Sequence, residues 1–140
     1  MTDDIVIEAA PEEAFAFVDD PANQVAVTPS MLSASVLESH PDGRKRVEYT
    51  YKLAGITLSG RARGVERDPP NRLVQSFSGA MEGTVTFRFA AENGATRVTY
   101  TAEIDLPEAV FDAAPRSELQ SHVEEGARRA LSALKEHLEA

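Results

Sequence analysis

Apolar and polar residues alternate with a period of two over most of residues 31–105, which predicts a series of β-strands. The clearest of these segments is KRVEYTYKLA, residues 45–54. Turn sequences separate the segments, most strongly the Asp-Gly pair in HPDGR (40–44) and the Asn-Gly pair in ENGA (92–95). Because no helical period intervenes between the strands, we expect an antiparallel sheet in which sequence neighbours pair.

The two ends of the chain show different patterns. The segment DIVIEA (4–9) predicts a first strand, and two short helices are expected between residues 11 and 27. After the last strand, the sequence SELQ (117–120) forms a capping-box pattern. Apolar residues then recur at helical spacing as far as Leu138, which predicts an amphipathic helix of about six turns.

The numbers of strands and helices constrain the fold. Seven strands make a sheet roughly 29 Å wide, whereas one helix is only ~10 Å thick. The sheet must therefore curl around the long helix to keep its apolar face dry. We predict an α+β fold in which a curved seven-stranded antiparallel sheet wraps around a long C-terminal helix, with two short helices after strand 1. A chain of 140 residues without repeats is expected to form a single domain, residues 1–140.

The inward face of this sheet combines aromatic, polar and small residues. Its expected members are Val47, Tyr49, Tyr51, Leu58, Gly60, Ala62, Leu73, Gln75, Phe77, Val85, Phe87, Phe89, Val98, Tyr100, Ala102 and Ile104, facing Gly126, Ala127 and Ala130 of the long helix. Small residues on both sides predict an unfilled volume, above all next to Gly60, Ala62 and Gly64. Alternatively, they allow the helix to approach the sheet closely. We favour the cavity, because Gln75 and three tyrosine hydroxyls need partners if they are buried.

Composition and charge exclude several functional classes. The net charge of −9 opposes binding to nucleic acid or to anionic membranes. The absence of cysteine excludes disulfides, thiolate metal sites and cysteine nucleophiles. No apolar run approaches the ~20 residues of a membrane span, and the acidic start does not resemble a signal peptide, so a cytoplasmic location is expected. Abundant acid with scarce lysine fits either adaptation to high salt or a high-GC genome with a soluble surface.

Few residues are candidates for catalysis or for binding a cofactor or metal ion. No phosphate-binding loop or dinucleotide fingerprint occurs, and the three histidines lie far apart, so no cofactor or metal site is expected. His122, at the edge of the helical apolar stripe, is the one weak candidate for a catalytic acid or base at the cavity mouth. The alternative is a boundary residue that is half in solvent or bonded to Glu118.

Four stretches of the chain carry a family resemblance. They are IEAAPEEAFAFVDDPAN, GVERDPPNRLVQSFSG, GTVTFRFAAENGATRVTYTAEI and LSALKEHLEA. With the order of elements, they resemble the START / polyketide cyclase superfamily, also called SRPBCC, which has the helix-grip fold. The resemblance implies a hydrophobic cavity for lipids, polyketides or other apolar ligands, in members that catalyse cyclisation or dehydration, carry ligands or assist other proteins. This chain lacks the aromatic that many relatives place after the second short helix, here QVAVTPS, which predicts a more open or differently shaped pocket there.

These observations favour a binding protein for a small hydrophobic or amphipathic ligand, such as a lipid, polyketide or isoprenoid-like molecule. The alternatives are a cyclase/dehydratase-type enzyme and an accessory protein that acts through its surface. Exposed edge strands allow a monomer or a homodimer. Phe111, in the linker before the long helix, either caps the pocket or anchors the loop. The expected ligand-binding residues are Tyr49, Tyr51, Leu58, Gly60, Gln75, Phe77, Phe87, Tyr100, Phe111, Val123 and Ala127.

Overall fold

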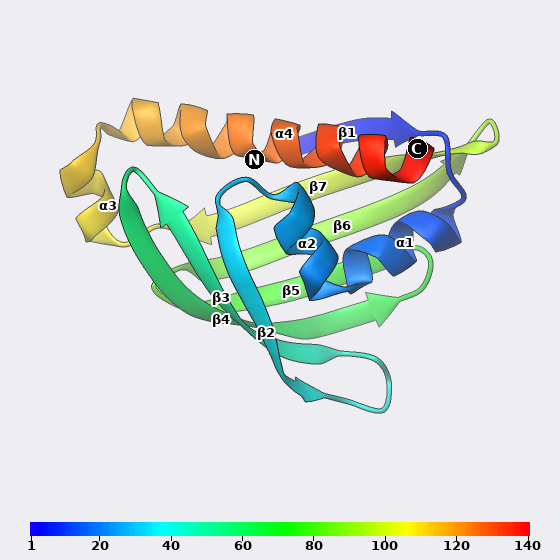
Figure 1. The fold of residues 1–140 in the computed structure, drawn as a ribbon, viewed down its shortest axis with the longest axis horizontal. Coiled ribbons are helices and arrows are strands. Elements are labelled where there is room, and N and C mark those ends of the chain that lie inside the picture. The colour runs from blue at the N-terminus through cyan, green and yellow to red at the C-terminus, as the bar shows by residue number, and fades with distance from the viewer.

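A seven-stranded antiparallel sheet and four helices make up the fold in the computed structural model, which describes residues 1–140 (Figure 1). The strands are β1 (Thr2–Ile7), β2 (Met31–Ser39), β3 (Lys45–Leu53), β4 (Ile56–Asp68), β5 (Arg72–Gly79), β6 (Glu82–Glu92) and β7 (Ala95–Asp105). The helices are α1 (Pro11–Asp19), α2 (Pro21–Val27), α3 (Glu108–Ala113) and α4 (Arg116–Glu139). None of these helices has the length and apolar character needed to cross a membrane.

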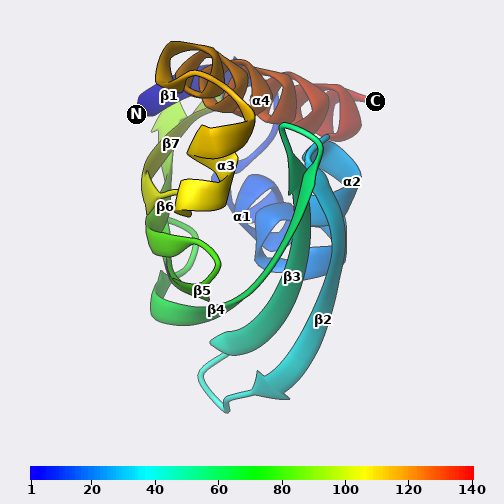
Figure 2. The ribbon, with the colours of Figure 1, turned by 90° about the vertical axis from the view of Figure 1, so that its left-hand side faces the viewer.

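The sheet has the order β1-β7-β6-β5-β4-β3-β2, so the first strand closes onto the last and β1 and β2 form the edges. Figure 2 shows the sheet bending into a trough, with α4 lying across its open side, α3 at one end and the two N-terminal helices inside the curve. This arrangement confirms the predicted α+β helix-grip architecture. The curvature follows from geometry, because one helix cannot cover a flat sheet of seven strands.

The apolar core is divided into three clusters along the trough. One joins α1, β1, β7 and the C-terminal half of α4 around Ile7, Phe15 and Leu134. A second lies on the floor of the sheet around Val47 and Tyr49. A third packs α3 and the start of α4 around Leu119. The middle of α4 belongs to none of them, and the main element contacts of this helix are with β1 and α2.

Two local expectations at the chain ends are wrong. The long helix begins at Arg116 after an N-cap Pro115 that makes no side-chain cap, so the capping-box sequence lies inside the first turn and does not cap it. The first strand begins at Thr2, two residues earlier than the alternation suggested. Thr2 and Asp3 pair with Thr101 and Tyr100 of β7. Backbone pairing, which apolar alternation does not report, extends the strand.

A candidate ligand cavity between the sheet and the long helix

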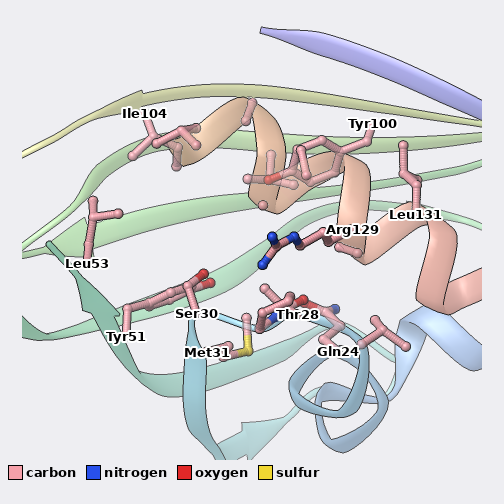
Figure 3. Close-up of a pocket in the computed structure, with 18 of the residues that line it drawn as sticks. Gln24, Thr28, Ser30, Met31, Tyr51, Leu53, Tyr100, Ile104, Arg129 and Leu131 are labelled. Carbon is pink, nitrogen blue, oxygen red and sulfur yellow. The ribbon is translucent and has the colours of Figure 1, made fainter. Parts of the chain in front are cut away.

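A cavity of about 410 Å³ lies between the sheet and the middle of α4 (Figure 3). Of the 30 residues that line it, 20 are hydrophobic. This volume and composition are typical of sites for small molecules, which span roughly 300–1,000 Å³ and are mostly apolar. The cavity therefore occupies the part of the trough that the three core clusters leave unfilled.

Side chains from β5, β6 and β7 form the apolar wall. Phe77, Val85 and Phe87 point inward from alternating positions of β5 and β6 and line the cavity. The ring of Phe87 meets the ring of Tyr100 edge-on, with centroids 5.2 Å apart. Because strand residues alternate between faces, the same pattern sends the polar neighbours of these residues to the outer surface.

Two tyrosine side chains bring polar atoms into this apolar space. Tyr51 on β3 and Tyr100 on β7 line the cavity, and Figure 3 shows their hydroxyl ends directed into it. Burial raises the pKa of Tyr100 to about 12. Burial, reinforced by repulsion from the neighbouring tyrosines, raises the pKa of Tyr51 well above its ordinary value. At neutral pH both hydroxyls are therefore protonated, and they can donate hydrogen bonds to a ligand.

Gln75 on β5 and Tyr49 on β3 are buried polar residues with unmet hydrogen-bonding capacity. Oε1 of Gln75 and the hydroxyl of Tyr49 are buried and have no hydrogen-bond partner. Burial raises the pKa of Tyr49 to about 12, and the nearby Gln75 side chain opposes this in part. Of these two residues, Gln75 lines the cavity and Tyr49 does not. A polar group of a ligand or a water molecule next to Gln75 would remove the cost of an unpaired buried amide oxygen.

Small residues form the middle of the cavity wall that α4 provides. Val123, Gly126, Ala127 and Ala130 line the cavity from this helix. A Cβ atom built on Gly126 would have no neighbouring atom within 4 Å. Glycine in a helix interior costs about 1 kcal/mol relative to alanine, and here no close packing contact requires it. The bare backbone at Gly126 leaves the cavity wider at this point.

The cavity opens between α4 and the segments that face it across the trough. The exposed lining residues mark this mouth: Pro29, Lys52, His122, Glu125 and Arg129. Thr28, Pro29 and Ser30 form the α2–β2 side of the mouth. This is the position after the second short helix at which many relatives have an aromatic residue and this chain has none. His122 lies at this mouth, and it makes no hydrogen bond with Glu118.

The structure brings most of the expected site residues together. Those that line the cavity are Tyr51, Gln75, Phe77, Phe87, Tyr100, Val123 and Ala127, together with His122. Four others lie outside the lining: Tyr49 behind Gln75 on the sheet floor, Leu58 and Phe111 in the cluster at α3, and Gly60 on β4. No cluster of three or more histidine, aspartate or glutamate side chains that could hold a metal ion is present.

The expectation of open space next to Gly60, Ala62 and Gly64 is wrong. A Cβ atom on Gly60 would lie 2.8 Å from the carbonyl oxygen of Ser78. Ala62 is buried in the cluster on the sheet floor, and a Cβ atom on Gly64 would lie 3.1 Å from Cβ of Arg44. The close neighbours of Gly60 and Gly64 belong to the segment from Ser78 to Ala80 and to Arg44, so they do not correspond to the alternative, which was a close approach of the long helix. The unfilled volume lies under α4 instead.

This packing predicts that Gly60→Ala destabilises the protein by about 1–3 kcal/mol, because the new methyl group must displace backbone. Gly126→Ala is the matched control, and it should raise the free energy of unfolding by up to about 1 kcal/mol because it removes a helical glycine without a clash. Urea unfolding followed by circular dichroism measures both changes. A Gly60→Ala variant as stable as the wild type would show that β4 has free space at this point.

Phe111 packs as an anchor of the linker before α4. It lies against the cluster that contains Leu58, Val110 and Leu119. The guanidinium carbon of Arg116 lies 4.1 Å from the centre of the Phe111 ring, a cation–π contact. Because the ring makes both contacts outside the cavity lining, this geometry fits the anchoring alternative.

Several lining residues come from segments that sequence reasoning left out. They come from α2, the α2–β2 loop, the ends of β2 and β3, and α4, and include Gln24, Thr28, Ser30, Met31, Leu53 and Arg129. Thr28 and Ser30 lie in the loop, which carries no periodic signal, so the alternation pattern could not identify them. Arg129 could have been found, because it lies three residues after Gly126 and therefore on the same side of the helix.

Known proteins share the architecture of this chain. Residues 1–139 match the model of the family described as polyketide cyclase / dehydrase and lipid transport. No curated protein matches the chain in sequence. Three solved structures have the same fold. The Thermus thermophilus protein TTHA0849 is 22% identical with a TM-score of 0.80, the alignment covering 99% of this chain and 95% of the other.

The other two are more distant in sequence. The ZhuI aromatase/cyclase of a Streptomyces species is 14% identical with a TM-score of 0.78, covering 99% of this chain and 92% of the other. A START superfamily protein of Mycobacterium smegmatis is 14% identical with a TM-score of 0.77, covering 99% and 96%. The resemblance to the START / polyketide cyclase (SRPBCC) superfamily is thus confirmed. The chain belongs to the polyketide cyclase / dehydrase and lipid transport family.

Proposed function

We propose that the protein binds a small hydrophobic or amphipathic molecule in the cavity under α4. The observation that carries this proposal is a cavity of about 410 Å³ in which 20 of 30 lining residues are hydrophobic. An enclosed apolar surface of this kind gains free energy when a ligand replaces water, at roughly 25 cal/mol per Å² of apolar area. Affinity comes mainly from this burial.

The polar groups of the cavity would orient a bound ligand through hydrogen bonds. Tyr51 and Tyr100 supply hydroxyl donors, and Gln75 supplies an amide oxygen that has no partner in the protein. A few polar atoms in an apolar site select ligands whose own hydroxyl or carbonyl groups meet them. We therefore expect a ligand that carries one or two oxygen atoms along an apolar skeleton.

A cyclase or dehydratase activity is the second candidate, and it is supported by the likeness to an aromatase/cyclase and by His122 at the mouth. The tyrosines of the cavity stay protonated at neutral pH because their pKa values are raised, so they can donate a proton but cannot accept one. An enzyme of this kind would therefore rely on His122 to accept a proton. The His122→Ala variant should then lose turnover of a polyketide substrate while keeping its affinity. Unchanged turnover would eliminate this role of His122.

The test of binding uses the absence of tryptophan. A lipophilic, environment-sensitive dye is titrated into the protein, and bound dye is displaced with fatty acids, isoprenoids and aromatic polycycles. We expect saturable dye fluorescence with one equivalent bound, displaced by one of these chemical classes. Dye binding that does not saturate, or that no ligand displaces, would contradict the proposal and direct attention to the outer surface of the sheet.

A further inference from the structure

We propose that the ligand is an anionic amphiphile whose acidic head lies at the cavity mouth beside Arg129, with its apolar part inside. This inference rests on the proposed function and specifies its ligand class. The starting observation is the distribution of charge. The chain carries 23 acidic residues against 14 basic ones, yet Glu125 is the only acid among the 30 residues that line the cavity.

Arg129 presents unused donors to the mouth. Its Nη2 donates to Oε1 of Glu125 at 2.7 Å, one helical turn away. Its Nε and Nη1 groups make no hydrogen bond within the protein. Figure 3 shows its guanidinium directed from α4 into the space bounded by Tyr51, Tyr100 and Thr28. A guanidinium has five N–H donors in a planar fork, so Arg129 can keep its bond to Glu125 and still bind a carboxylate or phosphate.

Lys52 is one of the exposed residues that line the mouth, and its ammonium forms no ion pair in the protein. Because side chains alternate along β3, Lys52 leaves the strand on the face opposite to Tyr51, so it adds to the local positive charge and the direct contact falls to Arg129. The mouth thus offers the free guanidinium donors of Arg129 from α4. On a protein with a net charge of −9, this is a local site where an anion is attracted.

The apolar interior of the cavity determines where the charge of a bound ligand can lie. No charged side chain lines the cavity away from the mouth, and an unpaired ion in apolar surroundings is strongly disfavoured. An acidic head must therefore remain at the mouth, where solvent and Arg129 stabilise it. The apolar part of the same molecule fills the space next to Phe77 and Phe87. A carboxylate and a phosphate share this chemistry.

The test compares ligands that differ only in the head. Dodecanoate, dodecyl phosphate and dodecanol displace the bound dye from the wild type, all below their micelle concentrations. We expect the better of the two anions to bind about three- to tenfold tighter than the alcohol, since charge-assisted hydrogen bonds exceed neutral ones. The preferred anion identifies the head as carboxylate or phosphate.

Neighbouring arginines provide a matched pair of variants. Arg129→Gln should remove most of the anion preference and leave the affinity for dodecanol unchanged. Arg128→Gln removes the same charge from the next residue, which is exposed but does not line the cavity, and it should preserve the preference. Equal affinities for anion and alcohol in the wild type, or equal losses in both variants, would overturn the inference while leaving the proposed function intact. If neither dodecanol nor the anions displaced the dye, the proposed function itself would fail.

Discussion

Gly126→Leu should abolish saturable binding of apolar ligands and leave the protein at least as stable as the wild type. Gly126 lines the cavity, and no atom lies within 4 Å of the position where its side chain would begin. A leucine there projects into the space that a ligand needs, and we expect a loss of affinity of at least about tenfold, because the overlapping part of the ligand must be expelled. Leucine also favours the helix over glycine by up to about 1 kcal/mol.

Dye titration and urea unfolding of the same preparation measure the two effects. The matched control is Ser132→Leu, which adds the same side chain to α4 at an exposed position outside the cavity lining. It should keep the wild-type affinity. If Gly126→Leu bound the dye as tightly as Ser132→Leu, the ligand would not use the volume under α4, and the assignment of the site would be wrong.

The second large effect is a loss of stability at alkaline pH that originates in the tyrosines. Tyr49, Tyr51 and Tyr100 are the only tyrosines of the chain, and all three lie in or beside the cavity. Burial raises the pKa of Tyr49 from 10.0 to about 12. Between these values the folded protein holds the proton that the unfolded chain has released. Rising pH therefore favours unfolding, and the stabilisation present below pH 10 is lost as pH rises toward 12.

For Tyr49 this difference corresponds to about 3 kcal/mol, and Tyr100 acts in the same direction. We expect tyrosinate absorbance to appear in one step that coincides with the loss of helical circular dichroism. Tyr49→Phe should shift that step to higher pH, because one of the groups that must ionise is gone. A tyrosine that ionised reversibly near its ordinary pKa in the folded protein would contradict the burial of these hydroxyls.

Sequence periodicity was sufficient for the architecture because the helix-grip fold is built from amphipathic elements. Alternation identified the strands from β2 to β7, and the apolar spacing of α4 identified the helix that covers them. The errors lie at boundaries, where backbone pairing decides. Thr2 and Asp3 extend β1 through their pairing with β7, and the sequence of these two residues contains no apolar signal for it.

The site was harder to predict because empty volume depends on distances between elements. Small residues on β4 and on α4 carry the same signal in the sequence, yet at Gly60 the neighbouring strand β5 fills the space and at Gly126 nothing does. The inward aromatic residues Phe77 and Phe87 were identified because strand alternation fixes their direction. Of the mouth, only His122 was identified. The α2–β2 loop carries no periodic signal, and Arg129 is polar and lies at the border of the helical stripe.

Nuclear magnetic resonance can locate a bound ligand and so decide whether the cavity under α4 is the binding site. Tyrosine rings and valine and leucine methyl groups are labelled, and the dye or the best competing ligand is added to saturation. We expect shifts at Tyr51, Tyr100 and Val123 around the cavity, with unchanged signals at Val36 and Val65, which are exposed on the sheet away from the cavity lining. Shifts confined to Val36 and Val65, with the cavity residues unaffected, would contradict binding in the cavity and place it on the outer surface.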